Sequence, residues 1–283
     1  MPFVVGANRS GTTLLRLMLD AHPELAIPPE THFVPNLIEL FSEGAPSRDE
    51  ALAVITSRPE FADFGLAENA LAEAMAGADN SARGALLAFY GLYTAGQGKR
   101  RCGDKTPGYS TSMRGIEGVL PEARFVHIIR DGRDVALSVM SRGLRERTVE
   151  ELAKRWKRRI SKTRRQGAKV ANYTEVRYED LVTDTEPALR RICEFLDLPF
   201  DPSMLSYHER AAERMGEMSG ELEAAEGRQG LPAGHRSEMH AATSEPPQRE
   251  RVEKWKREID AEDVRAFEEI AGELLAELGY ESS

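Results

Sequence analysis

The stretch PFVVGANRSGTTLLRLM, residues 2–18, decides the fold. It starts with a short apolar run, Phe3 to Val5, which is typical of a strand and is broken by Gly6. After Gly11 the leucines recur at helical spacing, so the pattern predicts a strand, a loop and a helix. Such a junction points backbone N–H groups and the positive end of the helix dipole at one place. The sequence therefore predicts a site for phosphate or another tetrahedral anion.

The loop lacks the lysine of a nucleoside triphosphatase. Gly6 and Gly11 have the spacing of a nucleotide-binding P-loop, but Thr12 stands where that lysine would reach the β- and γ-phosphates. The donors that the loop offers are Arg9, Ser10, Thr12 and Thr13. This set predicts an anion that does not arrive as a metal chelate, and no metal site is expected. The alternative is a tight strand-to-helix turn without a ligand.

Composition indicates one globular domain over residues 1–283, with 41% hydrophobic and 30% charged residues. No apolar run approaches the ~20 residues that cross a bilayer, and the first apolar run is too short for a secretory signal. Two cysteines, Cys102 and Cys193, fit a reducing compartment, so a cytoplasmic protein is expected. The net charge of -9 argues against binding nucleic acid. An anionic ligand must then be held by a local cluster of donors.

The next segments supply two candidate side chains near the loop. Leu25 to Ile27 is a second strand candidate, expected in one parallel sheet with the first, and a helix is expected from Glu30 to Phe41. Glu30 and His32 then follow the carboxyl end of a strand, where open α/β sheets bind ligands. Glu30 is interpreted as a general base, with a helix cap as the alternative. Lys105, before a Thr-Pro pair that prevents an immediate helix, is expected to face the same edge.

A second constellation is ARFVHIIRDGRDVALSVMSR, residues 123–142. Its apolar run is typical of a strand buried on both faces, and the run ends at Arg130. His127, within the run, is interpreted as a core histidine. A helix capped by Asp131 would place Ser138 and Arg142 on one face, so both can join Arg130 around one anion. This predicts a second phosphate site.

Three further regions have less specific patterns. Residues 46–98 are predicted to form a helical insertion, which either shapes the acceptor side of a cleft or is only scaffold. The predicted helix at residues 152–171 has a basic face, interpreted as a solvated surface rather than a nucleic-acid site. In residues 216–249 apolar periodicity fails among glycines and prolines, so a lid or a disordered loop is expected.

Together these segments resemble the P-loop sulfotransferases, most of all the branch with the tyrosylprotein sulfotransferases and many bacterial enzymes. The resemblance rests on GANRSGTT at 6–13, GDKTP at 103–107, FVHIIRDGRDVALSVMSR at 125–142 and VRYEDLV at 176–182, and more weakly on residues 252–255. It implies an α/β P-loop fold of three layers, with a central, mainly parallel sheet between helices. It also implies transfer of a sulfuryl group from 3′-phosphoadenosine 5′-phosphosulfate (PAPS), leaving 3′-phosphoadenosine 5′-phosphate (PAP).

The resemblance also implies a role for each matching residue. The first loop, Arg9, Ser10, Gly11, Thr12 and Thr13, would grip the 5′-phosphosulfate. Arg130 and Ser138, with Arg142 as a helper, would hold the 3′-phosphate, and Tyr178 would lie near the nucleotide. Glu30 would be the base, while Lys105, with Arg9, would stabilise the leaving group. Glu245 stands where a lysine is expected, so Arg236, His240 or Arg249 is expected to replace that contact.

The expected reaction is transfer to a hydroxyl or amine of a small molecule or peptide, and the sequence leaves the acceptor open. Two alternatives remain. The first is an ATP-dependent P-loop kinase, suggested by residues 6–13 and opposed by Thr12. The second is a catalytically silent nucleotide-binding module, suggested by Glu245.

Overall fold

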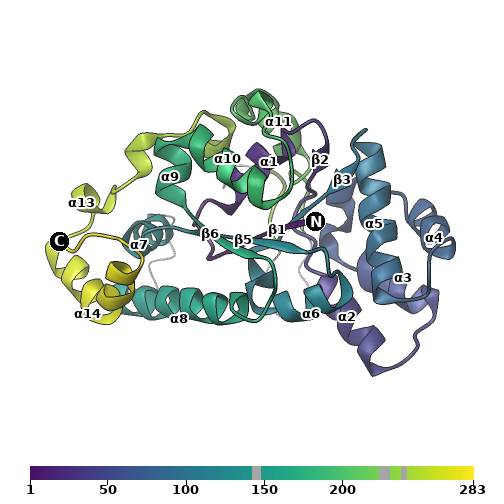
Figure 1. Ribbon diagram of the computed structural model, residues 1–283. Coiled ribbons are helices and arrows are strands. Elements are labelled where there is room, and N and C mark those ends of the chain that lie inside the picture. Colours follow the sequence, from purple (N-terminus) through teal and green to yellow (C-terminus); the bar gives the residue numbers. More distant parts are fainter. Residues whose placement is uncertain (142–147, 223–229, 237–240) are drawn as a thin grey trace.

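The centre of the molecule is a four-stranded parallel sheet with strand order β4-β1-β5-β6 (Figure 1). The computed structural model describes residues 1–141, 148–222, 230–236 and 241–283. The strands are β1 (Pro2–Gly6), β4 (Asp104–Lys105), β5 (Arg124–Ile129) and β6 (Tyr173–Arg177). β1 and β5 are neighbours, and Gly6 is in register with Ile128. The loop after β1 and Arg130 after β5 therefore leave the sheet at the same edge.

Helices cover both faces of this sheet because its two central strands are apolar on both sides. Val4, Val126 and Ile128 pack under α1 (Thr12–Asp20), α9 (Tyr178–Thr183), α10 (Thr185–Phe195) and α11 (His208–Gly216). The alternate residues, Phe3 and Phe125 among them, point to the other face. The helices on that side include α2 (Val34–Glu43), α6 (Met113–Val119), α7 (Gly132–Met140), α8 (Val149–Gly167) and α14 (Ala261–Glu277). The predicted α/β fold with a parallel sheet between helices is confirmed.

The prediction that the second strand joins the same sheet as the first is wrong. β2 (Leu25–Ala26) pairs with β3 (Arg101–Cys102) in a separate two-stranded parallel sheet. The position beside β1 is taken by β4, which the chain reaches directly after β3 through Gly103. A Cβ atom on Gly103 would lie 2.8 Å from the Pro2 ring, so only glycine lets these segments approach so closely.

The helix expected from Glu30 begins four residues later. α2 starts at Val34, because two prolines precede Glu30 and His32 adopts a left-handed backbone conformation with φ 54°. Glu30 therefore lies in an irregular turn and does not cap the helix.

Residues 46–98 contain α3 (Arg48–Thr56), η1 (Pro59–Phe64), α4 (Glu68–Ala76) and α5 (Ala82–Gly96). Ser47 and Ser81 accept hydrogen bonds from backbone N–H groups in the first turns of α3 and α5, which fixes where these helices start. Edge-to-face contacts of Phe33 with Phe64 and Phe89 join the group to α2. These helices form the right side of the molecule in Figure 1.

The last part of the chain returns to the carboxyl edge of the sheet. After α11 come a bridge between Leu222 and Leu231, η4 (Ala241–Ser244), η5 (Arg249–Arg251), α13 (Trp255–Glu258) and α14. α13 begins only at Trp255, because Val252 is extended and Glu253 has φ 53°. Two further 3-10 helices, η2 (Pro107–Thr111) and η3 (Pro202–Met204), lie earlier in the chain.

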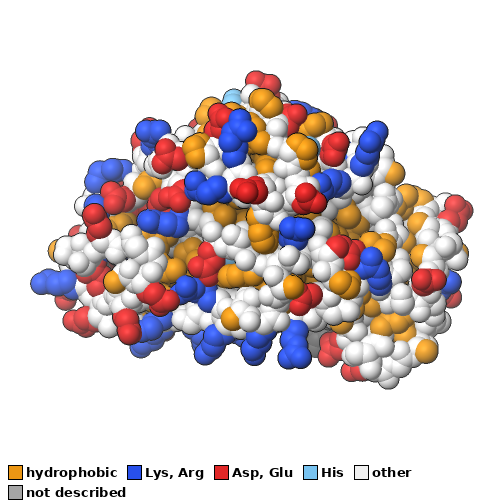
Figure 2. Space-filling model, in the orientation of Figure 1, with side chains coloured by type: hydrophobic (Ala, Val, Ile, Leu, Met, Phe, Trp, Pro, Cys, Tyr) orange, Lys and Arg blue, Asp and Glu red, His pale blue; other side chains and the backbone are white. Residues whose placement is uncertain are grey.

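The basic face of α8 lies at the surface. Lys154, Arg158, Lys162 and Arg165 are exposed, and Figure 2 shows a row of Lys and Arg side chains along the lower edge, where α8 runs in Figure 1. Within the described part of the chain, every helix is too short or too polar to cross a membrane.

Candidate active site

The loop between β1 and α1 is held in a tight conformation. Arg9 and Gly11 have left-handed φ angles of 71° and 92°, and the Ser10 N–H donates to the Ala7 carbonyl over 3.3 Å. A Cβ atom on Gly11 would lie 2.4 Å from Cδ2 of Tyr178. Glycine is therefore required at position 11 both by the backbone angle and by the tyrosine that packs on the loop.

This loop fits an anionic group. Gly11 is the N-cap of α1 and, as it has no side chain, it caps none of the first N–H groups of this helix. The Ser10 hydroxyl is buried and has no hydrogen-bond partner among the described residues. Thr12 and Thr13 are buried at the same helix end. Such a set of donors around a helix N-terminus suits the oxygens of a phosphate or sulfate ester.

Glu30 and Lys105 form an ion pair beside the loop. Lys105, at the end of β4, donates from Nζ to Oε1 of Glu30 over 2.6 Å and lies 3.5 Å from Oγ1 of Thr13. The Lys105 side chain is 1% exposed, whereas that of Glu30 is 29% exposed. His32 approaches the other carboxylate oxygen, with Nε2 3.3 Å from Oε2. The structure thus brings the predicted base, the predicted lysine and the first loop together.

Opposing effects set the ionisation of this pair. Burial raises the pKa of Glu30, but the Lys105 charge and the His32 hydrogen bond outweigh it, so the pKa lies well below its usual range. Burial lowers the pKa of Lys105, and the Glu30 carboxylate opposes that shift. Glu30 is therefore a carboxylate over the physiological range, which a proton acceptor requires.

The second predicted anion site lies next to the first. Asp131 caps α7 by accepting the Arg133 N–H over 2.9 Å, which sets the helix phase that brings Ser138 to the loop. Ser138 accepts a hydrogen bond from Nε of Arg9 over 3.2 Å. Arg9 therefore links the two sites, and its side chain lies with Ser138. Arg142 lies outside the described residues.

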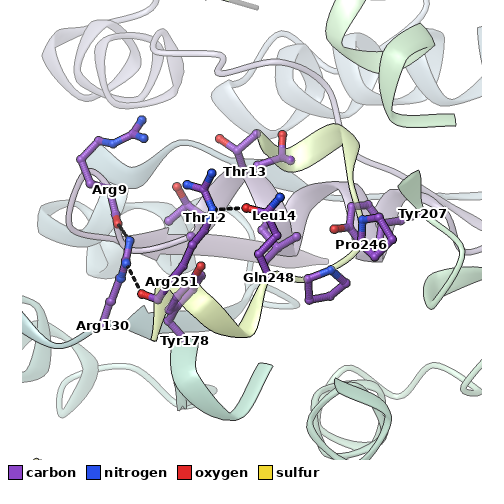
Figure 3. A pocket seen from close by; sticks show the side chains of 13 residues that line it. Arg9, Thr12, Thr13, Leu14, Arg130, Tyr178, Tyr207, Pro246, Gln248 and Arg251 are labelled. Atoms are coloured by element: carbon purple, nitrogen blue, oxygen red, sulfur yellow. Dashed lines mark hydrogen bonds between the residues drawn. The ribbon is translucent and has the colours of Figure 1, made fainter. Parts of the chain in front are cut away.

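Arg130 is fixed by partners from four segments. It donates to the carbonyl oxygens of Arg9 at 3.3 Å and Arg251 at 2.8 Å, drawn as dashed lines in Figure 3. Its guanidinium lies 4.4 Å from the ring centre of Tyr178 and 3.6 Å from a carboxylate oxygen of Asp134. The predicted residues Arg130 and Tyr178 thus stack on each other at the strand end.

A small pocket of about 80 Å³ joins these residues. It is lined by the first loop, Arg130 and Tyr178, together with Tyr207 and residues of the segment 243–251 (Figure 3). The sequence did not identify Arg251, whose carbonyl accepts from Arg130 and whose Nε donates to Gln248 over 2.6 Å. The signal for it was its position directly before the weakly matching residues 252–255.

That weak match has a structural explanation. The N–H of Trp255 donates to Oδ1 of Asp134 over 2.9 Å, and the guanidinium of Arg133 lies 3.6 Å from the Trp255 ring centre. Residues 252–255 therefore anchor the pocket segment to α7, the helix of Ser138.

The residues expected to replace a lysine at position 245 have other partners. Arg236 forms an ion pair with Asp63 of η1, and Arg249 donates to the Thr183 carbonyl over 2.7 Å. His240 lies outside the described residues. The carbonyl of Glu245 accepts the Tyr207 hydroxyl over 2.5 Å, which holds the segment at the pocket.

The prediction for His127 is confirmed. Its side chain is buried, and Nδ1 lies 2.7 Å from the Tyr173 hydroxyl. Burial, with smaller effects from nearby arginines, lowers the pKa of His127 to about 3. It is a neutral histidine of the core, within the central strand β5.

The chain is similar in sequence to known sulfotransferases. The chain is 32% identical over 217 residues to a protein-tyrosine sulfotransferase A of Caenorhabditis elegans, covering 74% of this chain and 52% of the relative. It is 26% identical over 286 residues to a Drosophila melanogaster protein-tyrosine sulfotransferase, covering 99% and 51%. The chain therefore spans about half the length of these two relatives.

Comparison with solved structures gives the same fold. A sulfotransferase domain from the curacin biosynthetic pathway superposes with a TM-score of 0.62 at 22% identity, covering 100% of this chain and 98% of that domain. The sequence model described as "Sulfotransferase family" matches residues 3–202, which contain the residues of both predicted anion sites, Glu30 and Lys105. The chain belongs to the sulfotransferase family.

Proposed function

We propose that the chain transfers a sulfuryl group from PAPS to a hydroxyl acceptor. The observation that carries the proposal is the chain of contacts across the carboxyl edge of the sheet. Glu30 pairs with Lys105, Lys105 approaches Thr13 of the first loop, and Arg9 of the same loop contacts Ser138. An acid–base pair and two anion sites thus share one loop that lacks a triphosphatase lysine.

The donor would be held at two anionic groups. Ser10, Thr12, Thr13 and the first N–H groups of α1 would take the 5′-phosphosulfate, where Ser10 has a buried hydroxyl without a partner in the described residues. Arg130 and Ser138 would take the 3′-phosphate, and Arg9, in contact with Ser138, would serve both. Two charged groups at a fixed separation favour PAPS over a nucleotide with one phosphate chain.

The residues also support the transfer step. The acceptor oxygen forms a bond to sulfur as the bond from sulfur to the bridging oxygen breaks, and PAP leaves as the anion. Glu30 would take the proton of the acceptor hydroxyl, and Lys105 would stabilise the charge on the leaving phosphate. No metal is needed for this charge balance, and positioning accounts for much of the rate, as in phosphoryl transfer.

We propose that residues 46–98 border the acceptor side of the site and that the described parts of residues 216–249 border its donor side. Arg236 of the second region pairs with Asp63 of the first, so the two regions touch. The segment 243–248 lines the pocket beside Tyr178 and forms part of the proposed lid. The acceptor group is a hydroxyl. It belongs either to a peptide tyrosine, as the names of the relatives indicate, or to a small molecule.

A ligand comparison tests the donor first. At equal concentration, PAP should raise the melting temperature far more than AMP or Mg²⁺-ATP does. Labelled PAPS with a panel of phenol, sugar and tyrosine-peptide acceptors then tests transfer. A preference for Mg²⁺-ATP would instead identify a kinase, and PAP binding without transfer to any acceptor would identify a silent nucleotide-binding module.

A further inference from the structure

A cluster of buried and partly buried polar and charged residues lies outside the site just described. Arg214 of α11 is 4% exposed and is surrounded by charged and polar groups from α1, α5 and the turn after α5. The members are Arg16, Asp20, Tyr93, Lys99, Arg214 and Glu217. None of them has a part in the proposed transfer step, and burying so many charged groups costs stability unless each is paired and hydrogen-bonded inside the protein.

The cluster converges on the backbone of Ile27. The Ile27 N–H donates to Oδ1 of Asp20 over 2.8 Å. Its carbonyl accepts from Nε of Arg16 at 3.0 Å and from Nη2 of Arg214 at 3.2 Å. Arg214 also grips Asp20, with Nε 2.8 Å from Oδ2 and Nη2 3.1 Å from Oδ1. Both backbone groups of one residue are thus held by side chains that are themselves paired.

Ile27 stands at the start of the turn that carries Glu30. Two prolines, Pro28 and Pro29, join them, and proline restricts the backbone of this short link. Thr31, on the far side of Glu30, is fixed by two hydrogen bonds. Its N–H donates to Oγ1 of Thr106 over 3.1 Å, and its hydroxyl donates to Oδ2 of Asp104 over 2.7 Å. The turn is therefore anchored at both ends, and the upstream anchor is the Arg214 cluster.

We propose that Arg214 is a positioning residue for the reaction: through Asp20 and the Ile27 carbonyl, it holds the Ile27–Glu30 turn so that the Glu30 carboxylate meets Lys105 and the acceptor. This inference rests on the proposed function. Arg214 is far along the chain from Glu30 and acts only through the turn. A displacement of a reacting group by about 1 Å costs roughly 100-fold in rate, so a loosened turn affects turnover strongly.

The same cluster connects the turn to the lid region. Glu217 lies directly after α11. Its Oε2 accepts a hydrogen bond from Nη2 of Arg16 over 3.0 Å, and its carboxylate also forms an ion pair with Arg214. The residues that follow lead to the segment lining the pocket. Arg214 thus ties the catalytic turn, the helix that starts at the first loop, and the entry to the lid region into one unit.

A double-mutant cycle tests the proposal. Arg214→Met is expected to lower kcat at least tenfold while the Kd for PAP, measured by calorimetry, stays within threefold. In a Glu30→Gln background the same substitution should lower kcat by less than twofold, because Arg214 acts through Glu30. Equal losses in both backgrounds, an unchanged kcat, or a loss confined to PAP affinity would each overturn it.

Arg124→Met is the matched control. Arg124 also donates to a backbone carbonyl, that of Phe195 over 2.6 Å, but it does so at the opposite end of β5. It should keep kcat within twofold. If Arg214→Met does not fold, Arg214→Met with Asp20→Asn removes both charges, keeps an oxygen for the Ile27 N–H, and replaces it in the cycle.

A readout without turnover separates this inference from the proposed function. Hydrogen exchange followed by mass spectrometry should show faster exchange at the Ile27 amide in Arg214→Met, with the strand amides of β1 unchanged. If the wild-type chain fails to turn over PAPS, the proposed function fails while this result still decides whether Arg214 holds the turn. Unchanged exchange at Ile27 would overturn the positioning role.

Discussion

The carboxylate of Glu30 lies 2.6 Å from the ammonium group of Lys105, at the edge where β1 and β4 end. Lys105 is fully buried, so its charge is compensated inside the protein by Glu30 rather than by water. The proton acceptor and the cation proposed for the leaving group therefore neutralise each other. An anion that draws Lys105 towards itself would leave the Glu30 carboxylate available to an acceptor hydroxyl.

Glu30→Gln should remove proton acceptance without disturbing the donor site. We expect kcat to fall by about 10²- to 10⁴-fold, the usual contribution of a general base. The Kd for PAP should remain within threefold, as measured by calorimetry. Glu39→Gln, an exposed residue of α2, is the control and should keep full turnover. Near-normal turnover of Glu30→Gln would exclude the base assignment.

The ion pair predicts how activity depends on pH. A carboxyl whose pKa is depressed in the folded protein contributes stability that is present above its unfolded value of about 4.3 and is lost as the pH falls through the folded value. Glu30 should therefore give no acid limb in kcat/KM above pH about 4.3.

The lysine causes this depression, so its removal has a defined effect on the profile. In Lys105→Met the effect of burial on Glu30 is opposed only by His32, and the acid limb of the residual kcat/KM should move to higher pH. Stopped assays with labelled PAPS between pH 4 and 9 would measure both profiles. An acid limb at the same pH in both proteins would contradict the role of Lys105.

Arg130→Ala should weaken the preference for PAP over AMP. A charge-assisted hydrogen bond contributes about 1.5–3 kcal/mol, so the preference for PAP should fall by roughly 10- to 150-fold, and less in Ser138→Ala. Titration calorimetry with both nucleotides measures the ratio. Ser141→Ala, on the same helix end but exposed, should keep the full preference.

Gly11→Ala should weaken both the fold and the donor site. The left-handed φ of 92° costs a residue with a side chain roughly 1–3 kcal/mol, and the new methyl group would displace Tyr178. Urea unfolding should show this loss together with a reduced affinity for PAP. Gly108→Ala, where a Cβ atom meets open space, should unfold like the wild type.

The sequence predicted the parts of the fold whose signals are local. The apolar runs of β1 and β5, the glycines around the first loop and the Asp131 cap each specify their own segment. Because both strands run into the same edge, the amino-acid pattern alone was enough to place the loop and Arg130 together.

Other features depend on contacts between distant segments, and no local pattern reports them. β2 left the main sheet because β4, only two residues long, occupies the place beside β1. The cluster around Arg214 draws on α1, α5 and α11, and its members look like ordinary surface charges in the sequence. Arg251 joins the candidate site through its backbone carbonyl, which accepts a hydrogen bond from Arg130. The type of its side chain does not predict such a contact.

The register of β1 and β5, in which Gly6 pairs with Ile128, sets the distance between the two predicted anion sites. Each residue of slip would move one anion site against the other by about 3.3 Å and turn every side chain to the opposite face. The spacing between the two sites is therefore built into the sheet. The loop and α7 then position the individual donors around the two predicted anion sites.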